Sequence, residues 1–322
     1  MLITSLLTIA LAGVLVAATS SPAIHKRDIA PWAGSNLYFL HALPITEQER
    51  YINTLASWGV KVIRLWVTGL PGGCIKSSPN TTAIPHLEPT TVGTFDTTVL
   101  AALDATLARL HSAGLKAIIS PHDAGQIAGA NGCDAYCAKY GNQTAFYTSA
   151  QGTQDYDARL AVVLGYESAH FSGRKWGELS EVVLAFDVQN EPMIDAVGLL
   201  EEGDPGDWCE AVDIVSVHGY MSKAEDWAYF ITGDASILRA VEAADPRKEV
   251  VIEEWGVAAD SEDGFDTQVE VFNDAGVPWL YWQVVPGKDQ TQGGAPENCG
   301  YDGFEIGLNS TKGNISAAIA NA

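Results

Sequence analysis

The stretch that decides the fold reads VVLAFDVQNEP and spans residues 182–192. Its first eight residues are mostly apolar, and such a continuous run favours a strand buried on both faces, as in a parallel sheet. Pro192 would end that strand, because proline has no N–H to donate to a neighbouring strand. Glu191 would then lie at the carboxyl end of the strand. Taken alone, Asn-Glu-Pro is explained equally well as a turn without chemistry.

Strand patterns and helix patterns alternate along the rest of the chain. Strands are predicted at residues 34–40, 60–67, 115–120, 182–189, 212–217, 249–253 and 277–282. Helices are predicted at about 47–57, 97–113, 144–171, 224–241 and 265–274. Thr46 and Glu49 form a capping-box pattern at the start of the first helix. Without tandem β-hairpins or a dividing linker, this alternation predicts one α/β domain with a parallel sheet.

Polar, ionisable or aromatic residues recur at the carboxyl ends of these predicted strands. They are Arg64, His122, Asn190, Glu191, His218, Tyr220, Glu254 and Trp282. Each of them alone is explained more simply as a solvated charge or a core residue. In a (β/α)8 barrel, however, the strands end on one face, and catalytic groups lie there. Their joint placement therefore favours a shared site.

With these residues in place, the sequence resembles glycoside hydrolase family 5, the clan A retaining β-glycanases that include β-mannanases and cellulases. The resemblance runs from residue 34 to about 307 and rests on NEP at 190–192 and EEWG at 253–256. It implies a (β/α)8 TIM barrel in which Glu191 is the general acid/base and Glu254 is the nucleophile. The family pattern places the nucleophile directly before the aromatic-Gly pair, which selects the second glutamate of EEWG.

Cleavage of a glycosidic bond explains why two carboxyl groups are required. One must stay protonated to give a proton to the leaving oxygen, and the other must be ionised to attack the anomeric carbon. Retaining enzymes hold the two groups about 5–5.5 Å apart. The resemblance further implies that Arg64 orients Glu254 and that Tyr220 donates a hydrogen bond to it.

The remaining residues of the resemblance would contact the sugar. Asn190 would bond to the 2-hydroxyl, His122 and His218 would line the −1 subsite, and Trp282 would give the ring an apolar platform. This chemistry calls for no metal and no organic cofactor. The resemblance favours an endo-β-1,4-mannanase that works as a monomer on a polysaccharide, and the alternative substrate is a β-1,4-glucan.

The N-terminal residues resemble a secretory leader. Residues 1–23 hold an uncharged apolar core that ends in small residues, as in a signal peptide, and Lys26-Arg27 could end a short propeptide. The mature domain would then span 28–322, and we expect it to be secreted and extracellular. Asn-x-Ser/Thr sequons, which predict a glycoprotein, begin at Asn80, Asn142, Asn309 and Asn314.

Charge and cysteine content bound the partners and the compartment. The formal charge is −22, from 40 acidic and 18 basic residues, and such a field repels phosphate. We therefore expect no nucleic-acid partner, and no second apolar stretch is long enough to predict a membrane span. There are five cysteines, which favours disulfides in an oxidising compartment. Cys133 and Cys137 are a candidate local pair, and the odd number leaves one cysteine over.

The interval between Glu191 and His218 is too short for a complete barrel. Only 26 residues separate them, whereas helix four, strand five and helix five should lie there. One strand-crossover-strand unit alone takes about 30 residues or more. We therefore expect a TIM barrel that lacks one βα unit, with a segment lost near Trp208-Cys209. The alternative to an enzyme is then a non-catalytic or misfolded homologue.

Overall fold

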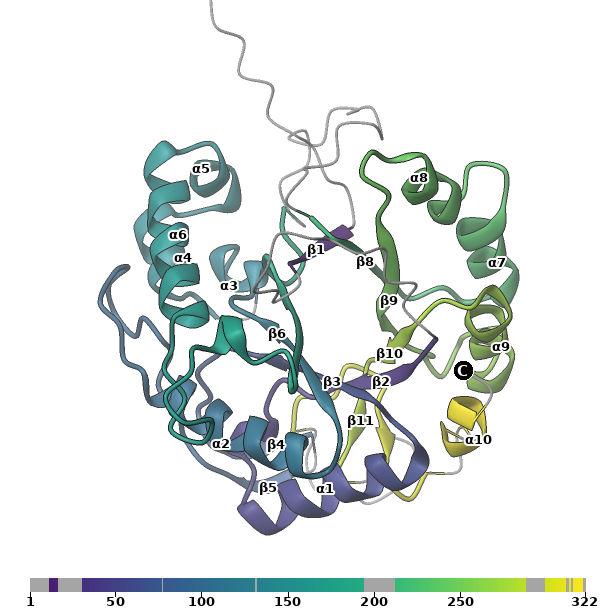
Figure 1. The fold of residues 1–322 in the computed structure, drawn as a ribbon, viewed down its shortest axis with the longest axis horizontal. Coiled ribbons are helices and arrows are strands. Elements are labelled where there is room, and N and C mark those ends of the chain that lie inside the picture. Colours follow the sequence, from purple (N-terminus) through teal and green to yellow (C-terminus); the bar gives the residue numbers. More distant parts are fainter. Residues whose placement is uncertain are drawn as a thin grey trace, which may run out of the picture.

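The computed structural model describes residues 12–16, 31–76, 78–130, 132–193, 212–287, 299–310, 313 and 315–320. In this part of the chain, seven parallel strands form most of the wall of a barrel, and helices lie outside it (Figure 1). In order around the barrel the strands are β7 (Val183–Asp187), β6 (Lys116–Ser120), β3 (Val62–Trp66), β2 (Ala33–Asn36), β10 (Trp279–Tyr281), β9 (Glu249–Trp255) and β8 (Ile214–Gly219).

The place between β7 and β8 is taken by an antiparallel strand. β1 (Ala12–Val16) pairs with β7 on one side and with β8 on the other, and it closes the ring. The parallel series is therefore one strand short of eight, as the short interval before His218 predicted. Residues 194–211, where the missing unit was expected, lie outside the described residues. β1 falls inside the predicted signal peptide, so its removal would leave the facing edges of β7 and β8 unpaired.

The helices cover the outside of the strands (Figure 1). They are α1 (Ile45–Trp58), α2 (Thr98–Ser112), α3 (Ala124–Ile127), α4 (Ala135–Tyr140), α5 (Gln143–Tyr147), α6 (Ala150–Leu164), α7 (Ala224–Thr232), α8 (Ile237–Ala243), α9 (Phe265–Ala275) and α10 (Ile315–Ala320). Short 3-10 turns are η1 (Leu40–Ala42) and η2 (Trp176–Glu178). Among the described residues, no helix is both long and apolar enough to cross a membrane.

Several predicted boundaries were wrong. The capping box at Thr46 is absent: α1 begins at Ile45 after Pro44, and no side chain caps it. Proline fixes its own φ and suits a position at the start of a helix, so the helix begins two residues earlier than predicted. The helix predicted at 144–171 is α5 followed by α6, because Ser149 caps a new helix. The strand at 182–189 ends at Asp187.

Two apolar cores hold the barrel together. Inside the ring, one residue from each of six parallel strands forms a small cluster, namely Val62, Ile118, Ala185, Ile214, Val251 and Leu280. A larger cluster fills the space between the strands and the helices. Alternate residues of a strand point to opposite faces, so the apolar run that begins at Val182 supplies both cores. This explains why the strand has no polar face until its carboxyl end.

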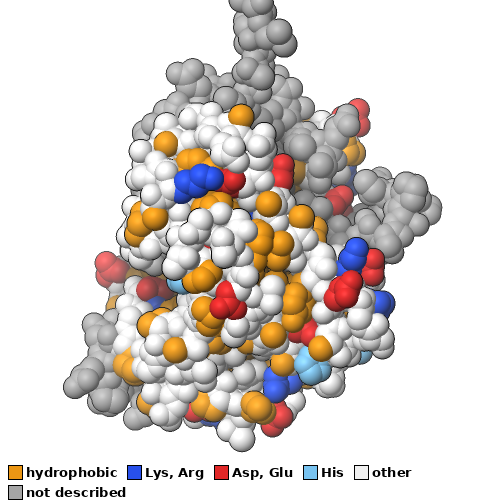
Figure 2. Space-filling model, turned by 90° about the vertical axis from the view of Figure 1, so that its left-hand side faces the viewer, with side chains coloured by type: hydrophobic (Ala, Val, Ile, Leu, Met, Phe, Trp, Pro, Cys, Tyr) orange, Lys and Arg blue, Asp and Glu red, His pale blue; other side chains and the backbone are white. Residues whose placement is uncertain are grey.

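Two disulfides tie the loops. Cys133 pairs with Cys137, as the spacing predicted, and Cys74 pairs with Cys299 across 225 residues of sequence. The second bond joins the loop between β11 (Val284–Val285) and β12 (Ile306–Gly307) to the hairpin of β4 (Gly73–Ile75) and β5 (Ser78–Thr81). The remaining cysteine, Cys209, lies outside the described residues. On the face in Figure 2, charged side chains lie in small separate groups between apolar ones.

Candidate active site

Arg64 on β3 lies at the centre of the candidate site and is fully buried. Its Nε lies 2.9 Å from Oδ2 of Asp187, its Nη2 lies 2.9 Å from Oδ1 of Asn190, and its Nη1 pairs with Oε1 of Glu254. Burial alone would lower the pKa of Arg64, but the charges of Asp187, Glu253 and Glu254 outweigh it and raise that pKa. Arg64 is therefore a permanent cation facing carboxyl groups from β7 and β9.

Glu254, near the carboxyl end of β9, is held from two sides. Arg64 contacts Oε1, and the hydroxyl of Tyr220 donates to Oε2 over 3.0 Å. Burial raises the pKa of Glu254, against the charges of His218 and Arg64, which lower it. The side chain of Glu254 is only 4% exposed. One of its oxygens lies within 4.8 Å of an oxygen of Glu191, so the two carboxyl groups face each other.

Glu191 follows β7 in a left-handed backbone conformation, with φ of 43°. For a residue other than glycine this conformation costs on the order of 1–3 kcal/mol, and such strained residues cluster at functional sites. Its Oε1 lies 3.3 Å from Nδ1 of His218. Burial alone would raise the pKa of Glu191, but the hydrogen bond and charge of His218 outweigh it and lower that pKa. The side chain remains 31% exposed, unlike that of Glu254.

His218 on β8 lies among three carboxyl groups. Its Nδ1 lies 3.3 Å from Glu191 and 3.6 Å from Glu254, and its Nε2 lies 3.2 Å from Glu253. Burial works against the charged imidazole, but the charge of Glu254 and the hydrogen bonds to Glu191 and Glu253 raise the pKa of His218 to about 10. With such a pKa both ring nitrogens carry protons near neutral pH, and both donate to the surrounding carboxyl groups.

Asn190 links the strand end to its neighbours. Its Oδ1 accepts from Arg64, and its Nδ2 donates to Oδ1 of Asp123 over 3.0 Å. Its backbone N–H donates to the carbonyl of His122. A side-chain amide has two N–H groups, and among the described residues only Asp123 accepts from Nδ2, so the second N–H is available to a ligand hydroxyl.

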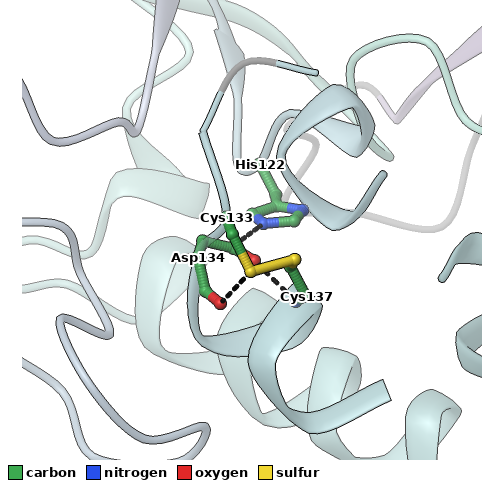
Figure 3. The surroundings of a disulfide bond; sticks show 4 residues. All are labelled: His122, Cys133, Asp134 and Cys137. Atoms are coloured by element: carbon green, nitrogen blue, oxygen red, sulfur yellow. Dashed lines mark hydrogen bonds and ion pairs between the residues drawn. A yellow bond between two sulfur atoms is a disulfide. The ribbon is translucent and has the colours of Figure 1, made fainter. Parts of the chain in front are cut away.

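His122 follows β6 and is buried, and both of its ring nitrogens have protein partners. Nε2 lies 2.6 Å from Oδ2 of Asp134, and Nδ1 lies 2.8 Å from Nε2 of Gln189. Figure 3 shows Asp134 beside the disulfide of Cys133 and Cys137, with its carboxylate turned toward His122. His122 thus joins the disulfide loop to the strand end before Asn190. Its expected contact with sugar in the −1 subsite stays a prediction.

Aromatic side chains form one wall beside the site. The ring of Trp282 lies 5.5 Å from that of Trp66 and 6.1 Å from that of Tyr38, and Arg64 lies 5.6 Å from the ring of Trp66. The indole nitrogen of Trp282 donates to Oδ2 of Asp302 over 3.0 Å. These contacts fix the orientation of the predicted platform.

The structure brings Arg64, Asn190, Glu191, His218, Tyr220 and Glu254 into one contact network. Sequence reasoning missed two members, Asp187 and Glu253, which both contact Arg64. Each had a signal: Asp187 is a lone charge inside an apolar strand, and Glu253 directly follows the apolar run at residues 250–252 of its strand. Buried charges are rare unless they are paired, so both could have been expected to have partners.

Comparison with known proteins identifies the fold. No protein-family model matches the sequence, and no curated protein matches it either. Among solved structures, an endo-1,4-β-D-mannanase from Thermotoga petrophila is similar with a TM-score of 0.62 and 16% identity, over 90% of this chain and 98% of that one. An endo-1,4-β-mannanase from Rhizomucor miehei has a TM-score of 0.58 and 15% identity, over 95% and 98%.

A third similar structure is a glycoside hydrolase family 5 mannosidase from Rhizomucor miehei, with a TM-score of 0.58 and 14% identity. It covers 92% of this chain and 94% of that one. The match therefore spans nearly all of both chains, although the sequences have diverged far. This chain has the barrel fold of these glycoside hydrolases, with seven parallel strands among its described residues.

Proposed function

We propose that this protein is a secreted retaining glycoside hydrolase that cleaves a β-linked polysaccharide, with endo-β-1,4-mannan as the favoured substrate. One observation carries the proposal: an oxygen of Glu191 and an oxygen of Glu254 lie within 4.8 Å of each other. Inverting enzymes hold their carboxyl groups about 6.5–9.5 Å apart to admit a water molecule, whereas retaining enzymes keep them about 5–5.5 Å apart. The short separation supports a double displacement.

In the first step, the carboxylate of Glu254 attacks the anomeric carbon. The glycosidic bond breaks as Glu191 gives its proton to the leaving oxygen, and a glycosyl ester forms on Glu254. In the second step, the carboxylate of Glu191 takes a proton from a water molecule, the resulting hydroxide attacks the anomeric carbon, and the ester bond breaks. Both carboxyl groups then regain their starting states. Arg64 and Tyr220 stabilise Glu254 when it is ionised, before attack and after release.

The substrate has to change the proton distribution of the free site. His218 lowers the pKa of Glu191, whereas a general acid must be protonated. Glu191 is 31% exposed, and a bound sugar would cover it. Loss of water raises the pKa of a carboxyl group. Substrate binding would therefore protonate Glu191 in the complex, where the proton is needed.

The comparisons support the choice of mannan as substrate. The similar structures named above are mannanases or mannosidases, and a β-1,4-glucan is the alternative. A non-catalytic homologue is the competing class, because β7 and β8 pair with an antiparallel segment where an eighth parallel strand would lie.

Two observations support secretion. The N-terminal residues have the pattern of a leader, and the sequons at Asn80 and Asn142 are exposed. N-terminal sequencing of the exported protein would locate the cleavage site.

Hydrolysis assays with the purified protein test the proposal. The substrates are β-1,4-mannan, carboxymethylcellulose and a β-1,3-glucan, and the anomer formed first is followed by NMR. We expect mannan to be hydrolysed with retention, and rates at least about 10³-fold lower in Glu191→Ala and Glu254→Ala. Glu262→Ala is the matched control, since Glu262 is exposed and pairs with Lys223. Equal rates in all four proteins, or inversion, would refute the assignment.

A further inference from the structure

Two buried carboxyl groups behind the site have no part in these steps. Asp187 on β7 is 2% exposed, and Glu253 on β9 is 0% exposed. One oxygen of each group has hydrogen-bond donors. Oδ2 of Asp187 accepts from Arg64. Oε2 of Glu253 accepts from the hydroxyl of Ser216 over 2.5 Å and lies 3.2 Å from Nε2 of His218. The other oxygens, Oδ1 of Asp187 and Oε1 of Glu253, have no hydrogen-bond partner among the described residues.

The two groups converge on one atom, because Nε of Arg64 lies 2.9 Å from Oδ2 of Asp187 and 3.5 Å from Oε1 of Glu253. As two carboxylates they would repel each other. Among the described residues, Oδ1 of Asp187 would then have no donor, and Oε1 of Glu253 would have only its ion-pair contact with Nε of Arg64 at 3.5 Å. One added proton changes both conditions, since a carboxylic acid donates to a carboxylate. Carboxyl groups that share a buried site hold a proton for this reason.

The charges around the site lead to the same conclusion. Two cations, Arg64 and His218, are surrounded by four acidic side chains. These are Asp187, Glu191, Glu253 and Glu254. Neutrality then needs two protons, of which one serves the reaction. We propose that Asp187 carries the other and donates it to Glu253, and that ionised Glu253 is a positioning residue that keeps His218 doubly protonated and directed at Glu191.

The neighbours of each group decide which of the two is protonated. Burial raises the pKa of Asp187, and the contact with Glu253 raises it too, against the opposing charge of Arg64. Burial would also raise the pKa of Glu253, but the charge of Arg64 and the hydrogen bond and charge of His218 outweigh it and lower that pKa. Glu253 also accepts from Ser216, whereas the only described donor to Asp187 is Arg64.

The consequence for catalysis rests on the proposed function. With Glu253 ionised, His218 keeps its second proton and lowers the pKa of Glu191 in the free protein. Without that negative charge, Nε2–H of His218 would lose its charged acceptor and the ring its fixed orientation. The hydrogen bond from His218 to Glu191 would then weaken, and the pKa of Glu191 would rise. Glu253 would thus set the proton affinity of the acid/base without touching the substrate. Arg64, Glu254 and Tyr220 also face this cluster and are left unchanged in the test.

The test follows the titration of His218 by NMR in the full-length protein labelled at histidine. The protein has seven histidines, and His218→Asn identifies the signal of His218 by its loss. In the unsubstituted protein we expect a midpoint near pH 10. In Glu253→Gln we expect the midpoint to fall by at least about one pH unit, because the acceptor for Nε2–H loses its charge. In Asp187→Asn the amide can donate as the acid does, so a shift of less than about half a unit is expected.

Two outcomes would overturn the proposal. One is an unchanged midpoint in Glu253→Gln, and the other is an equal fall in Asp187→Asn, which would show that Asp187 had been ionised. Should Glu253→Gln fail to fold, infrared spectra of the unsubstituted protein and Asp187→Asn decide. The carbonyl band of a buried protonated carboxyl group should be present near neutral pH in the first and absent from the second, and its absence from both would overturn the proposal.

Activity is measured separately from titration, so the two proposals can fail independently. If no polysaccharide is hydrolysed but His218 titrates as expected, the carboxyl pair stands and the proposed function falls. If mannan is hydrolysed but Glu253→Gln leaves the titration of His218 unchanged, the reverse holds. When both stand, the alkaline limb of kcat/KM should move to higher pH in Glu253→Gln, a shift that a purely structural loss of activity would not produce.

Discussion

Removal of one hydroxyl group, in Tyr220→Phe, should slow the proposed reaction with little effect on the fold. The hydroxyl donates to Oε2 of Glu254 over 3.0 Å, and the Tyr220 ring keeps its contact with Phe304, at 4.4 Å, in the variant. A hydrogen bond to a charged group contributes about 1.5–3 kcal/mol. Loss of that contact from the nucleophile corresponds to a fall of about 10- to 150-fold in kcat/KM.

The same substitution should shift the pH profile in a known direction. Glu254 must be ionised to attack, and the Tyr220 hydroxyl stabilises its carboxylate. Burial already raises the pKa of Glu254, so loss of the donor raises it further. The acidic limb of kcat/KM should therefore move to higher pH. The assay measures kcat and KM on soluble mannan at a series of pH values, with thermal unfolding followed in parallel.

Tyr229→Phe is the matched control, because Tyr229 lies on α7 and is 70% exposed. It should keep the rate and the pH profile of the unsubstituted protein. If Tyr220→Phe lost less than about twofold in rate, far below the effect expected of such a hydrogen bond, the role given to this contact would be wrong. If it lost rate through unfolding, its unfolding temperature would fall, whereas that of the control would not.

Three further predictions concern the acid/base, a disulfide and the N-terminal strand. His218 lowers the pKa of Glu191 in the free protein, and a bound sugar would cover Glu191 and raise that pKa. The alkaline limb of kcat/KM should therefore lie at lower pH than that of kcat, and coincident limbs would contradict this. Cys74→Ser removes a disulfide across 225 residues and should lower the free energy of unfolding by about 2–5 kcal/mol in denaturant titrations, where an unchanged midpoint would contradict the estimate. Deletion of residues 1–27 removes β1 and leaves the facing edges of β7 and β8 unpaired. Calorimetry should therefore show a lower unfolding temperature than for the full chain. An equal temperature would show that β1 adds no stability.

Much of the architecture could be predicted from local patterns. The apolar run from Val182 predicted β7, and the spacing of later runs predicted β8 and β9 within two residues at each end of the observed strands. These predictions succeed because a parallel strand that is buried on both faces is a nearly continuous run of apolar residues. Boundaries set by other contacts were missed, and α1 begins after Pro44 where a Thr46 cap was predicted.

By itself, the sequence determined the order of the elements and the placement of Glu191 and Glu254 at strand ends, because hydrophobic periodicity and strand termination are local properties of the chain. Only the tertiary structure decided which charges meet. Arg64 contacts Asp187 and Glu254 across 123 and 190 residues of sequence, and His218 lies among carboxyl groups from β9 and from the turn after β7. A pKa and a shared proton depend on burial and on distances between charges, which closure of the barrel creates and which the spacing of residues along the chain does not specify.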